Sequence, residues 1–359
     1  MLNGIGDIVC VSPTLQALKQ RYPGAKLTVI VRPHLRELLD SSPSVDEVIP
    51  YETGRHWKRP LFMWKLNRRR FDLWVDLHVP TFNTVSSNRR DFTRNAWIMR
   101  AAAARFRRAY AVPELAPWLS HPLALPTAAA LGSTNIVDTT LELADATADH
   151  SFCKYIPVAA DDHAWAANEL PDREGPRVAL FFGSRQAADL WPDARILEFI
   201  ALLDAALPDA ELVLIGGEHE RALTALLAER TDGSRRRAPR DFICRASLPR
   251  TAALLARCDT IVATDSGPMH VADAMRIPIV ALFSSKNHPA IWRPIEPRSL
   301  LINHAVACGP CFRATCPVSN KCMDMIAPGE VLAALEQLLP TVGATTRIPA
   351  ANDGLATPA

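Results

Sequence analysis

The stretch "TIVATDSGPMHVADAMRIPIVALF", residues 260–283, decides the fold class. Its two apolar runs, 260–264 and 279–283, have the length and residue types of buried β-strands. Between them, Gly267 permits a sharp turn and Pro268 suits the first position of a helix. A strand, a helix and a second strand in this order predict a parallel sheet with helices covering both of its faces.

The same alternation continues on both sides of this stretch. Further apolar runs lie at 26–31, 47–51 and 71–78 in the first half, and at 177–182, 211–217 and 241–246 in the second. We therefore expect an α/β protein of two domains with a ligand-binding cleft between them. The expected boundaries are 1–155 for the first domain, 156–176 for a linker, 177–340 for the second domain and 341–359 for a disordered tail.

The composition is that of a soluble globular protein. Of the 359 residues, 48% are hydrophobic and 22% are charged, and the formal net charge is +2. Because this balance is close to neutral, it argues against a dedicated nucleic-acid binder. No apolar run has the length of a membrane span, and the first residues do not resemble a signal peptide, so we expect a cytoplasmic protein.

The opening motif "GIGD", residues 4–7, is the first candidate site. Glycines such as Gly6 let backbone N–H groups approach an anion, and the start of a helix favours negative charge. Asp7 has two interpretations. Its carboxylate can cap the first turn of the helix, which the residues alone favour. It can also act as a general base toward a sugar hydroxyl at the rim of a cleft.

Three loops that follow predicted strands are further candidates. In "TDSGPMH", residues 264–270, the helix start offers N–H groups to an anion, although an ordinary cap with a solvent-facing histidine fits equally well. In "GGEHE", residues 216–220, the two glutamates complement a helix dipole, and ribose binding is the less favoured alternative. In "GSRQ", residues 183–186, Arg185 could clamp a diphosphate.

Three stretches are similar to glycosyltransferase family 9, the ADP-heptose:lipopolysaccharide heptosyltransferases and their relatives. They are "GIGDIVCVSPTLQALKQRYPGAKLTVIV", "DSGPMHVADAMRIPIVALF" and "CGPCFRATCP", and the resemblance extends to about residue 339. It implies a GT-B fold, in which two Rossmann-like domains with parallel sheets face a central cleft. It also implies inverting, metal-independent transfer of heptose from ADP-heptose to a lipopolysaccharide core acceptor, with no cofactor required.

The resemblance assigns roles to individual residues. Asp7 matches the proposed catalytic base, and Glu220 matches an acidic position that binds the nucleotide ribose. Asp265 would hold the donor sugar, and the helix start beside it would take the diphosphate. The expected donor-binding residues are Ser184, Arg185, Glu220, Asp265, Ser266, Gly267 and His270.

Two features depart from the family pattern. Relatives place a phosphate-binding lysine two residues before the Trp-Pro pair, where this chain has Asp189, whose carboxylate would be repelled by a diphosphate. We expect Asp189 to point away and Arg185 or Arg195 to take the role; a different donor or reduced activity are the alternatives. Relatives also begin with a short apolar strand. We expect Met1 to be a misassigned start with this strand upstream, and a degraded, inactive copy is the alternative.

The stretch "RHWKRPLFMWKLNRRRF", residues 55–71, has seven basic residues and no acidic ones. A helix with a buried apolar face is one interpretation, and nucleic-acid binding is disfavoured by the overall charge. The family's acceptor, an anionic glycolipid at the cytoplasmic face of the inner membrane, suggests a third, with peripheral association with that membrane. The expected acceptor-binding residues are Gly6, Lys58, Arg59, Arg68 and Arg69. The oligomeric state is not predicted.

Four cysteines, Cys308, Cys311, Cys316 and Cys322, lie close together in the sequence. Four thiolates can hold Zn²⁺ tetrahedrally, but a packed, reduced loop is the favoured interpretation and no metal is expected. The predicted function is therefore heptose transfer from ADP-heptose. The alternatives are a family 9 transferase with another nucleotide-sugar donor and a non-catalytic binding protein with the GT-B fold.

Overall fold

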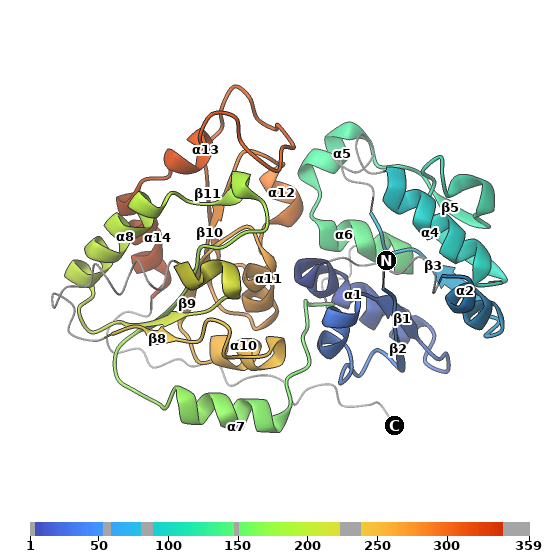
Figure 1. Cartoon of the computed structure of the whole chain (residues 1–359), viewed down its shortest axis with the longest axis horizontal. Coiled ribbons are helices and arrows are strands. Elements are labelled where there is room, and N and C mark those ends of the chain that lie inside the picture. The colour runs from blue at the N-terminus through green and yellow to red at the C-terminus, as the bar shows by residue number, and fades with distance from the viewer. Residues whose placement is uncertain (1–3, 53–58, 80–88, 147–150, 223–237, 340–359) are drawn as a thin grey trace. The chain divides into compact units, whose positions relative to one another are not determined.

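The computed structural model describes residues 4–52, 59–79, 89–146, 151–222 and 238–339. The chain divides into two compact units, which are coloured in sequence order in Figure 1. Unit 1 consists of Met1–Tyr155 and Ala290–Trp292, and unit 2 consists of Ile156–Pro289 and Arg293–Ala359. Within each unit the paired strands run parallel, so the expected α/β class with parallel sheets is confirmed.

Unit 2 contains a six-stranded sheet with the order β11-β10-β9-β6-β7-β8. Its strands are β6 (Arg177–Phe181), β7 (Glu211–Leu214), β8 (Arg240–Asp241), β9 (Thr260–Thr264), β10 (Ile279–Phe283) and β11 (Leu300–Asn303). All five residues of β6, of β9 and of β10 are buried. This burial on both faces explains why the central strands are uninterrupted apolar runs.

Helices cover both faces of this sheet. Alternate residues such as Val178 and Leu180 join a core cluster with residues of α8 (Asp193–Ala206) and α14 (Pro328–Leu338). The intervening residues point to the other face, where α11 (Gly267–Ala274) contacts β9 and β10. Helix α10 (Leu248–Leu255) contacts α11 and also α7 (Ala160–Glu169), so the predicted linker 156–176 contains a helix that packs on unit 2.

Trp191 anchors the core of unit 2. Its side chain is 1% exposed, and its ring lies 5.6 Å from that of Phe182 and 5.9 Å from that of Phe199, measured between centroids. The indole Nε1–H donates a hydrogen bond of 3.2 Å to the carbonyl of Ile326, so the one polar atom of the ring is satisfied. The loop that follows β6 is thereby fixed to the interior.

The strands of unit 1 form two separate sheets. Strand β1 (Thr28–Val31) pairs with β2 (Glu47–Pro50), and β3 (Leu73–Val75) pairs with β4 (Phe106–Tyr110), which pairs with β5 (His121–Leu123). The helices described here are α1 (Ile5–Arg21), α2 (Arg59–Asn67), α4 (Arg89–Ala101), α5 (Ala128–Ser133) and α6 (Ile136–Leu141). Helix α1 contacts α6 through a mostly buried surface.

A short segment from the second half of the sequence completes the core of unit 1. Ile291, in helix α12 (Pro289–Trp292), is 5% exposed and belongs to the same apolar cluster as Leu18 of α1 and Leu141 of α6. Trp292 packs against this cluster as well. The unit is therefore assembled from residues that are far apart along the chain.

Helix α1 contains the buried Pro13 and continues through it to Arg21. The segment after β1 forms the 3₁₀ helix η1 (Pro33–Leu38). The predicted tail, 341–359, lies outside the described residues. In the part of the chain that the structure describes, no helix is both long and apolar enough to cross a bilayer.

Candidate functional site

The carboxyl ends of β6, β7 and β9 bring three of the predicted donor loops together in unit 2. These strands are adjacent in the sheet and parallel, so the loops that follow them leave at the same edge. The Thr264 hydroxyl at the end of β9 donates a hydrogen bond of 2.7 Å to the carbonyl of Gly183, which follows β6. Ser184 and Asp265 are the next residues along these two loops, and both are half-buried.

Glu220 lies against the same loops. Its Oε2 accepts a hydrogen bond of 2.6 Å from the N–H of Gly217, which begins the 3₁₀ helix η6 (Glu218–Glu220). A Cβ atom at Gly183 would stand 1.9 Å from Oε1 of Glu220, so a larger residue there would have to displace the glutamate side chain. This position is compatible with both interpretations of the glutamates. They can complement the start of a helix, as the residues alone favour, or bind the ribose, as the family resemblance implies.

The start of α11 is not capped by the side chain of its N-cap residue. Ser266 occupies the N-cap position, but its hydroxyl donates 3.0 Å back to the carbonyl of Thr264 and does not cap the first turn. Gly267 begins the helix, and Asp265 precedes it. His270 is only 3% exposed, so the alternative with a solvent-facing histidine is wrong.

Asp189 is directed into unit 2 and paired with Lys286. Its Oδ1 accepts a hydrogen bond of 2.5 Å from the Ser284 hydroxyl, and its Oδ2 accepts one from the Lys286 ammonium. Lys286 also donates 2.9 Å to the side-chain carbonyl of Gln186. Sequence reasoning missed Lys286, although a lysine three residues beyond β10, at the edge where ligands bind α/β sheets, was a usable signal.

The two arginines proposed in place of the family's lysine differ in their surroundings. Arg185 is exposed in the loop after β6, next to Ser184. Arg195, on α8, forms ion pairs of 3.4 Å with Glu198 and 3.2 Å with Asp324. Arg195 is therefore engaged with two carboxylates.

Asp7 in unit 1 caps helix α1 and is half-buried. Its Oδ2 accepts a hydrogen bond of 2.9 Å from the backbone N–H of Gly4, the N-cap residue of the helix. This satisfies a donor that has no partner within the helix. Gly6, in the same turn, is half-buried too. The capping role of Asp7 is therefore observed. This role is compatible with a further role of the same carboxylate in catalysis.

His78 was not predicted, yet it lies in the electrostatic neighbourhood of Asp7. Burial lowers the pKa of His78, whereas the nearby carboxylates of Asp76 and Asp7 act in the opposite direction. Its backbone N–H donates 3.0 Å to Oδ1 of Asp76, and its ring packs edge-on against Phe92 with centroids 4.7 Å apart. Asp76 and His78 directly follow β3, and polar residues at the end of a parallel strand were the available signal.

The predicted acceptor residues lie mainly on and after α2. Lys58 is outside the described residues. Arg59 begins α2, and Arg68 stacks over the ring of Trp64 at 4.9 Å. Arg69 binds Glu47 with an N–O distance of 2.5 Å. Arg68 is therefore held on an exposed aromatic ring, whereas Arg69 is engaged in an ion pair.

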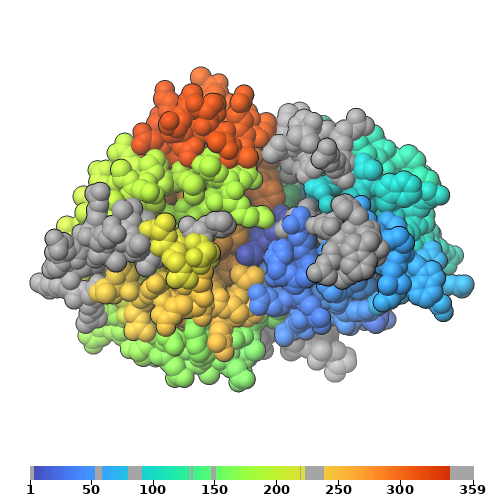
Figure 2. All heavy atoms as spheres, viewed as in Figure 1, coloured from blue at the N-terminus to red at the C-terminus, as the bar shows by residue number. Residues whose placement is uncertain are grey.

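Exposed tryptophans accompany these arginines. Trp64 on α2 is 55% exposed and Trp97 on α4 is 56% exposed, and the two helices contact each other. Arg100 stacks over both Trp97 and Trp118, at 5.8 and 4.9 Å. We call this group, Trp64, Trp97, Trp118, Arg68 and Arg100, the aromatic-basic surface. Helix α2 lies at the outside of unit 1 in the space-filling view (Figure 2).

The four clustered cysteines carry free thiols, Cys308 exposed and Cys311, Cys316 and Cys322 half-buried. Among the residues that the structure describes, no group of three or more histidine, cysteine, aspartate or glutamate side chains is arranged to hold a metal ion. The alternative in which these cysteines form a zinc site therefore has no geometric support.

Comparison with known proteins adds the family context. The sequence model described as "Glycosyltransferase family 9 (heptosyltransferase)" matches residues 84–322, more than half of the chain. The match includes the loops after β6, β7 and β9, whereas Asp7 lies outside it. The family model thus covers the assembled loops of unit 2.

The chain is also similar to individual heptosyltransferases. The chain is 23% identical to lipopolysaccharide heptosyltransferase 1 of Pseudomonas aeruginosa over 348 residues, covering 88% of this chain and 85% of that protein. It is 32% identical to lipooligosaccharide heptosyltransferase 2 of Campylobacter jejuni over 85 residues, which is 23% of this chain and only 27% of that protein. The structure of Escherichia coli ADP-heptose lipopolysaccharide heptosyltransferase II matches with a TM-score of 0.72 and 21% identity, covering 94% of this chain and 96% of that one. This likeness confirms the expected fold class.

Proposed function

The chain belongs to glycosyltransferase family 9, the heptosyltransferase family, and from this membership we propose that it transfers heptose from ADP-heptose to a sugar of the lipopolysaccharide core. The proposed reaction inverts the anomeric configuration and requires no metal. The observation that carries the proposal is the meeting of the loops after β6, β7 and β9 inside the region matched by the family. The names of the P. aeruginosa and E. coli relatives support the choice of donor and acceptor.

In the proposed donor site, Glu220 binds the ribose, Asp265 holds the sugar and the first turn of α11 receives the diphosphate. Support for this comes from Ser266, whose hydroxyl is turned to the Thr264 carbonyl and leaves the helix start uncapped by its own side chain. The partial positive charge of a helix start stabilises phosphate oxygens. Ser184, Gly267 and His270 complete the set of donor-binding residues together with Arg185.

The Asp189–Lys286 pair removes the electrostatic objection to a diphosphate donor. An isolated carboxylate would repel the donor, but this one is held by an ammonium group and a hydroxyl inside unit 2. The pair is neutral overall, so its field falls off faster than that of a single charge. We therefore propose that the cation which meets the diphosphate is Arg185, exposed in the loop after β6.

In the proposed mechanism, Asp7 takes the proton of the acceptor hydroxyl as that oxygen attacks the anomeric carbon. The bond from the anomeric carbon to the phosphate oxygen breaks on the opposite side, and ADP leaves with the electron pair. Burial favours the neutral form of His78, so this side chain does not cancel the negative charge that a base needs. Capping the helix and accepting a proton are compatible because a carboxylate has several acceptor sites.

We also propose that unit 1 receives the anionic acceptor, with Gly6, Lys58, Arg59, Arg68 and Arg69 as the acceptor-binding residues. The aromatic-basic surface supports a peripheral association with the cytoplasmic face of the inner membrane. Tryptophan rings settle at the level of lipid headgroups, and arginines are attracted to anionic lipids. Arg68 and Arg100, each stacked on an exposed tryptophan, combine both properties.

The proposal is tested with purified protein, ADP-heptose and a lipopolysaccharide core acceptor that lacks the heptose to be transferred. Asp7→Asn keeps an oxygen for the Gly4 N–H but removes the base, so transfer should fall about 10²- to 10⁴-fold. Donor affinity, measured by calorimetry, should stay unchanged. Asp138→Asn is the matched control, because Asp138 lies in the first turn of α6 and is exposed.

The outcomes separate the alternatives. If Asp7→Asn loses donor affinity or unfolds together with the loss of transfer, Asp7 is a structural cap only. If the unmodified protein transfers a different sugar in preference to heptose, it is a family 9 transferase with another donor. If it binds nucleotide-sugars and transfers none, it is a binding protein with a transferase fold.

A further inference from the structure

The side chain of Gln186 is held by Lys286 at the carboxyl edge of the sheet in unit 2. Gln186 is exposed in the loop after β6, and its Oε1 accepts a hydrogen bond of 2.9 Å from the ammonium group of Lys286. Lys286 lies three residues beyond β10, and only β9 separates β10 from β6 in the sheet. Because these parallel strands end at the same edge, the contact joins the two loops that flank the loop after β9.

Lys286 is itself fixed by further contacts. Its side chain is 4% exposed, and its ammonium group also binds Oδ2 of Asp189. The other oxygen of Asp189, Oδ1, accepts a hydrogen bond of 2.5 Å from the Ser284 hydroxyl. The backbone carbonyl of Lys286 accepts a hydrogen bond of 2.9 Å from the N–H of Phe312. Lys286 therefore presents its N–H donor to Gln186 from a fixed position.

This contact determines how the amide group of Gln186 is turned. An ammonium group can only donate hydrogen bonds, so the amide oxygen has to face Lys286 and the NH₂ group has to face away from it. The reverse orientation would place two sets of N–H donors against each other. Within the described ranges of the chain, no residue accepts a hydrogen bond from the NH₂ group of Gln186. Two N–H donors of fixed orientation are thus available to a ligand.

Two neighbouring residues offer donors on the same turn. The Ser184 hydroxyl oxygen accepts a hydrogen bond of 3.1 Å from the backbone N–H of Gln186, and no described residue accepts the hydrogen of that hydroxyl. Arg185, between them, is exposed and forms no ion pair with the described part of the chain. Phosphate oxygens accept several hydrogen bonds at once, and those from a cation are the strongest. Three consecutive residues with unused donors therefore suit a diphosphate.

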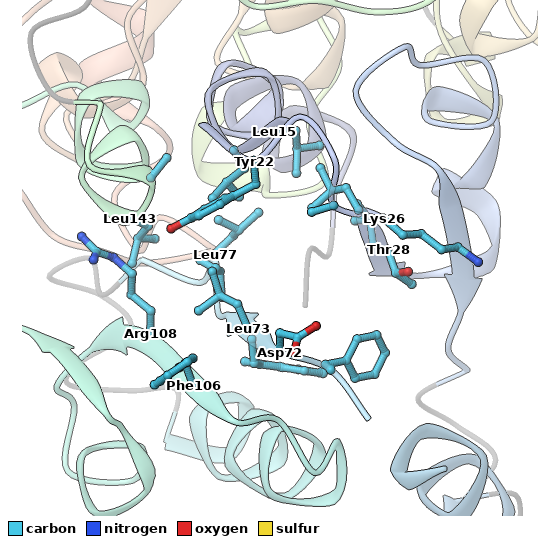
Figure 3. A pocket seen from close by; sticks show the side chains of 18 of the residues that line it. Leu15, Tyr22, Lys26, Thr28, Asp72, Leu73, Leu77, Phe106, Arg108 and Leu143 are labelled. Atoms are coloured by element: carbon cyan, nitrogen blue, oxygen red, sulfur yellow. The ribbon is translucent and has the colours of Figure 1, made fainter. Parts of the chain in front are cut away.

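A cavity of about 900 Å³ in unit 1 offers less to such an anion. Figure 3 shows Lys26 and Arg108 on different sides of it. Lys26 binds Glu47 with an N–O distance of 2.8 Å, and Arg108 binds Asp145. A phosphate group in this cavity would have to compete with both carboxylates for these cations. The turn after β6, by contrast, has donors that are not engaged.

We propose that Gln186 is a further donor-binding residue, whose NH₂ group donates to the diphosphate, and that Lys286 is the positioning residue that turns its amide. This proposal rests on the proposed function, in which the neighbouring Ser184 and Arg185 bind the same donor. Lys286 acts through Gln186 and does not itself touch the diphosphate. Without Lys286, the amide of Gln186 would have to be ordered when the donor binds, and this ordering lowers affinity.

The test of the direct contact compares ADP with adenosine, which lacks the diphosphate, on the full chain. Gln186→Glu keeps an oxygen for Lys286 but removes the N–H donors, so the affinity for ADP, measured by calorimetry, should fall about 10- to 100-fold. The affinity for adenosine, measured in competition with ADP, should stay unchanged. Gln337→Glu is the matched control, because it makes the same change of charge at an exposed position of α14.

The test of the positioning role removes the buried pair as a unit. The double variant Asp189→Leu with Lys286→Met leaves no buried charge without a partner, so it should fold. Its affinity for ADP should fall about tenfold, because the amide of Gln186 is then free to turn. Gln186→Met lacks both the oxygen and the N–H donors. If Lys286 acts only through Gln186, adding Gln186→Met to the double variant gives the same affinity as Gln186→Met alone.

Each other outcome contradicts a defined part of the proposal. Equal ADP affinity of Gln186→Glu and the unmodified protein overturns the direct contact, and so does an equal loss for ADP and adenosine. Full ADP affinity of the double variant, or a loss that adds to that of Gln186→Met, overturns the positioning role of Lys286. These results leave the proposed function standing. That function fails, and this inference with it, if the unmodified protein binds neither ADP nor ADP-heptose.

Discussion

The ammonium group of Lys286 and the carboxylate of Asp189 form an ion pair inside unit 2, with side chains that are only 4% and 5% exposed. Lys286 follows β10, and Asp189 ends the 3₁₀ helix η5 (Ala187–Asp189), so the pair connects the loops after β10 and β6. It places a charge of each sign in the interior, where neither is stable alone.

Removing one member of this pair should destabilise the protein strongly. Asp189→Asn leaves the ammonium of Lys286 buried without its counter-charge, and the free energy of unfolding should fall by about 3–5 kcal/mol. Urea denaturation measures this change. The exposed pair Arg36–Asp40 is the control, and Asp40→Asn should cost at most about 0.5 kcal/mol. The double variant Asp189→Leu with Lys286→Met should recover much of the loss, and a double variant as unstable as Asp189→Asn would contradict the explanation.

Gly183→Ala should displace Glu220 and weaken donor binding. The new methyl group would lie 1.9 Å from Oε1 of Glu220, so the glutamate has to leave its place beside Gly217. We expect the affinity for ADP-heptose, measured by calorimetry, to fall about tenfold, which corresponds to about 1.4 kcal/mol. Gly329→Ala, in helix α14 with nothing within 4 Å, is the control and should leave affinity unchanged. If the two variants bind ADP-heptose with equal affinity, Glu220 is not part of the donor site.

His78 should make the stability of the protein depend on pH near neutrality. Burial lowers the pKa of His78 in the folded state, while an unfolded histidine takes up its proton near pH 6.5. Below about pH 6.5 the unfolded state therefore binds more protons, and the free energy of unfolding decreases as the pH falls. His78→Asn should flatten this decrease between about pH 5 and 7 in urea titrations. The exposed His34, changed to Asn, is the control, and a His78→Asn profile with the slope of the unmodified protein would refute the assignment.

The aromatic-basic surface should bind anionic membranes. Replacing the exposed Trp64 and Trp97 by serine removes the rings that settle among lipid headgroups, and co-sedimentation with vesicles containing phosphatidylglycerol should drop several-fold. Val318→Ser with Leu301→Ser, at two exposed apolar positions of unit 2, is the control and should bind like the unmodified protein. Equal losses in both double variants would show that the effect is not specific to this surface.

The central strands could be predicted from the sequence because burial on both faces imposes a simple pattern. The runs at 260–264 and 279–283 coincide with β9 and β10, whose residues are all buried. The type of the helix after β1, η1 (Pro33–Leu38), is harder to read from the sequence. Leu35 and Leu38 are buried three residues apart, which fits the three-residue turn of a 3₁₀ helix as well as one face of an α-helix.

The partners of single side chains were harder to foresee. The sequence showed that Asp189 departs from the family pattern, but not that its carboxylate is buried in an ion pair. Its partner Lys286 lies 97 residues further along the chain, and only the folded sheet brings the two loops together. His78 carried a usable signal, since it follows a strand, but the weak apolar pattern of β3 made the end of that strand uncertain.

Ile291 belongs to the core of unit 1 but is synthesised long after the rest of that unit. Because its side chain sits in the same cluster as Leu18 and Leu141, the first unit lacks part of its interior until the ribosome has passed residue 292. Fragments that stop at Tyr155 should expose that apolar surface and aggregate. Unit 1 is therefore synthesised first, but its apolar core can be completed only after most of unit 2 has been synthesised.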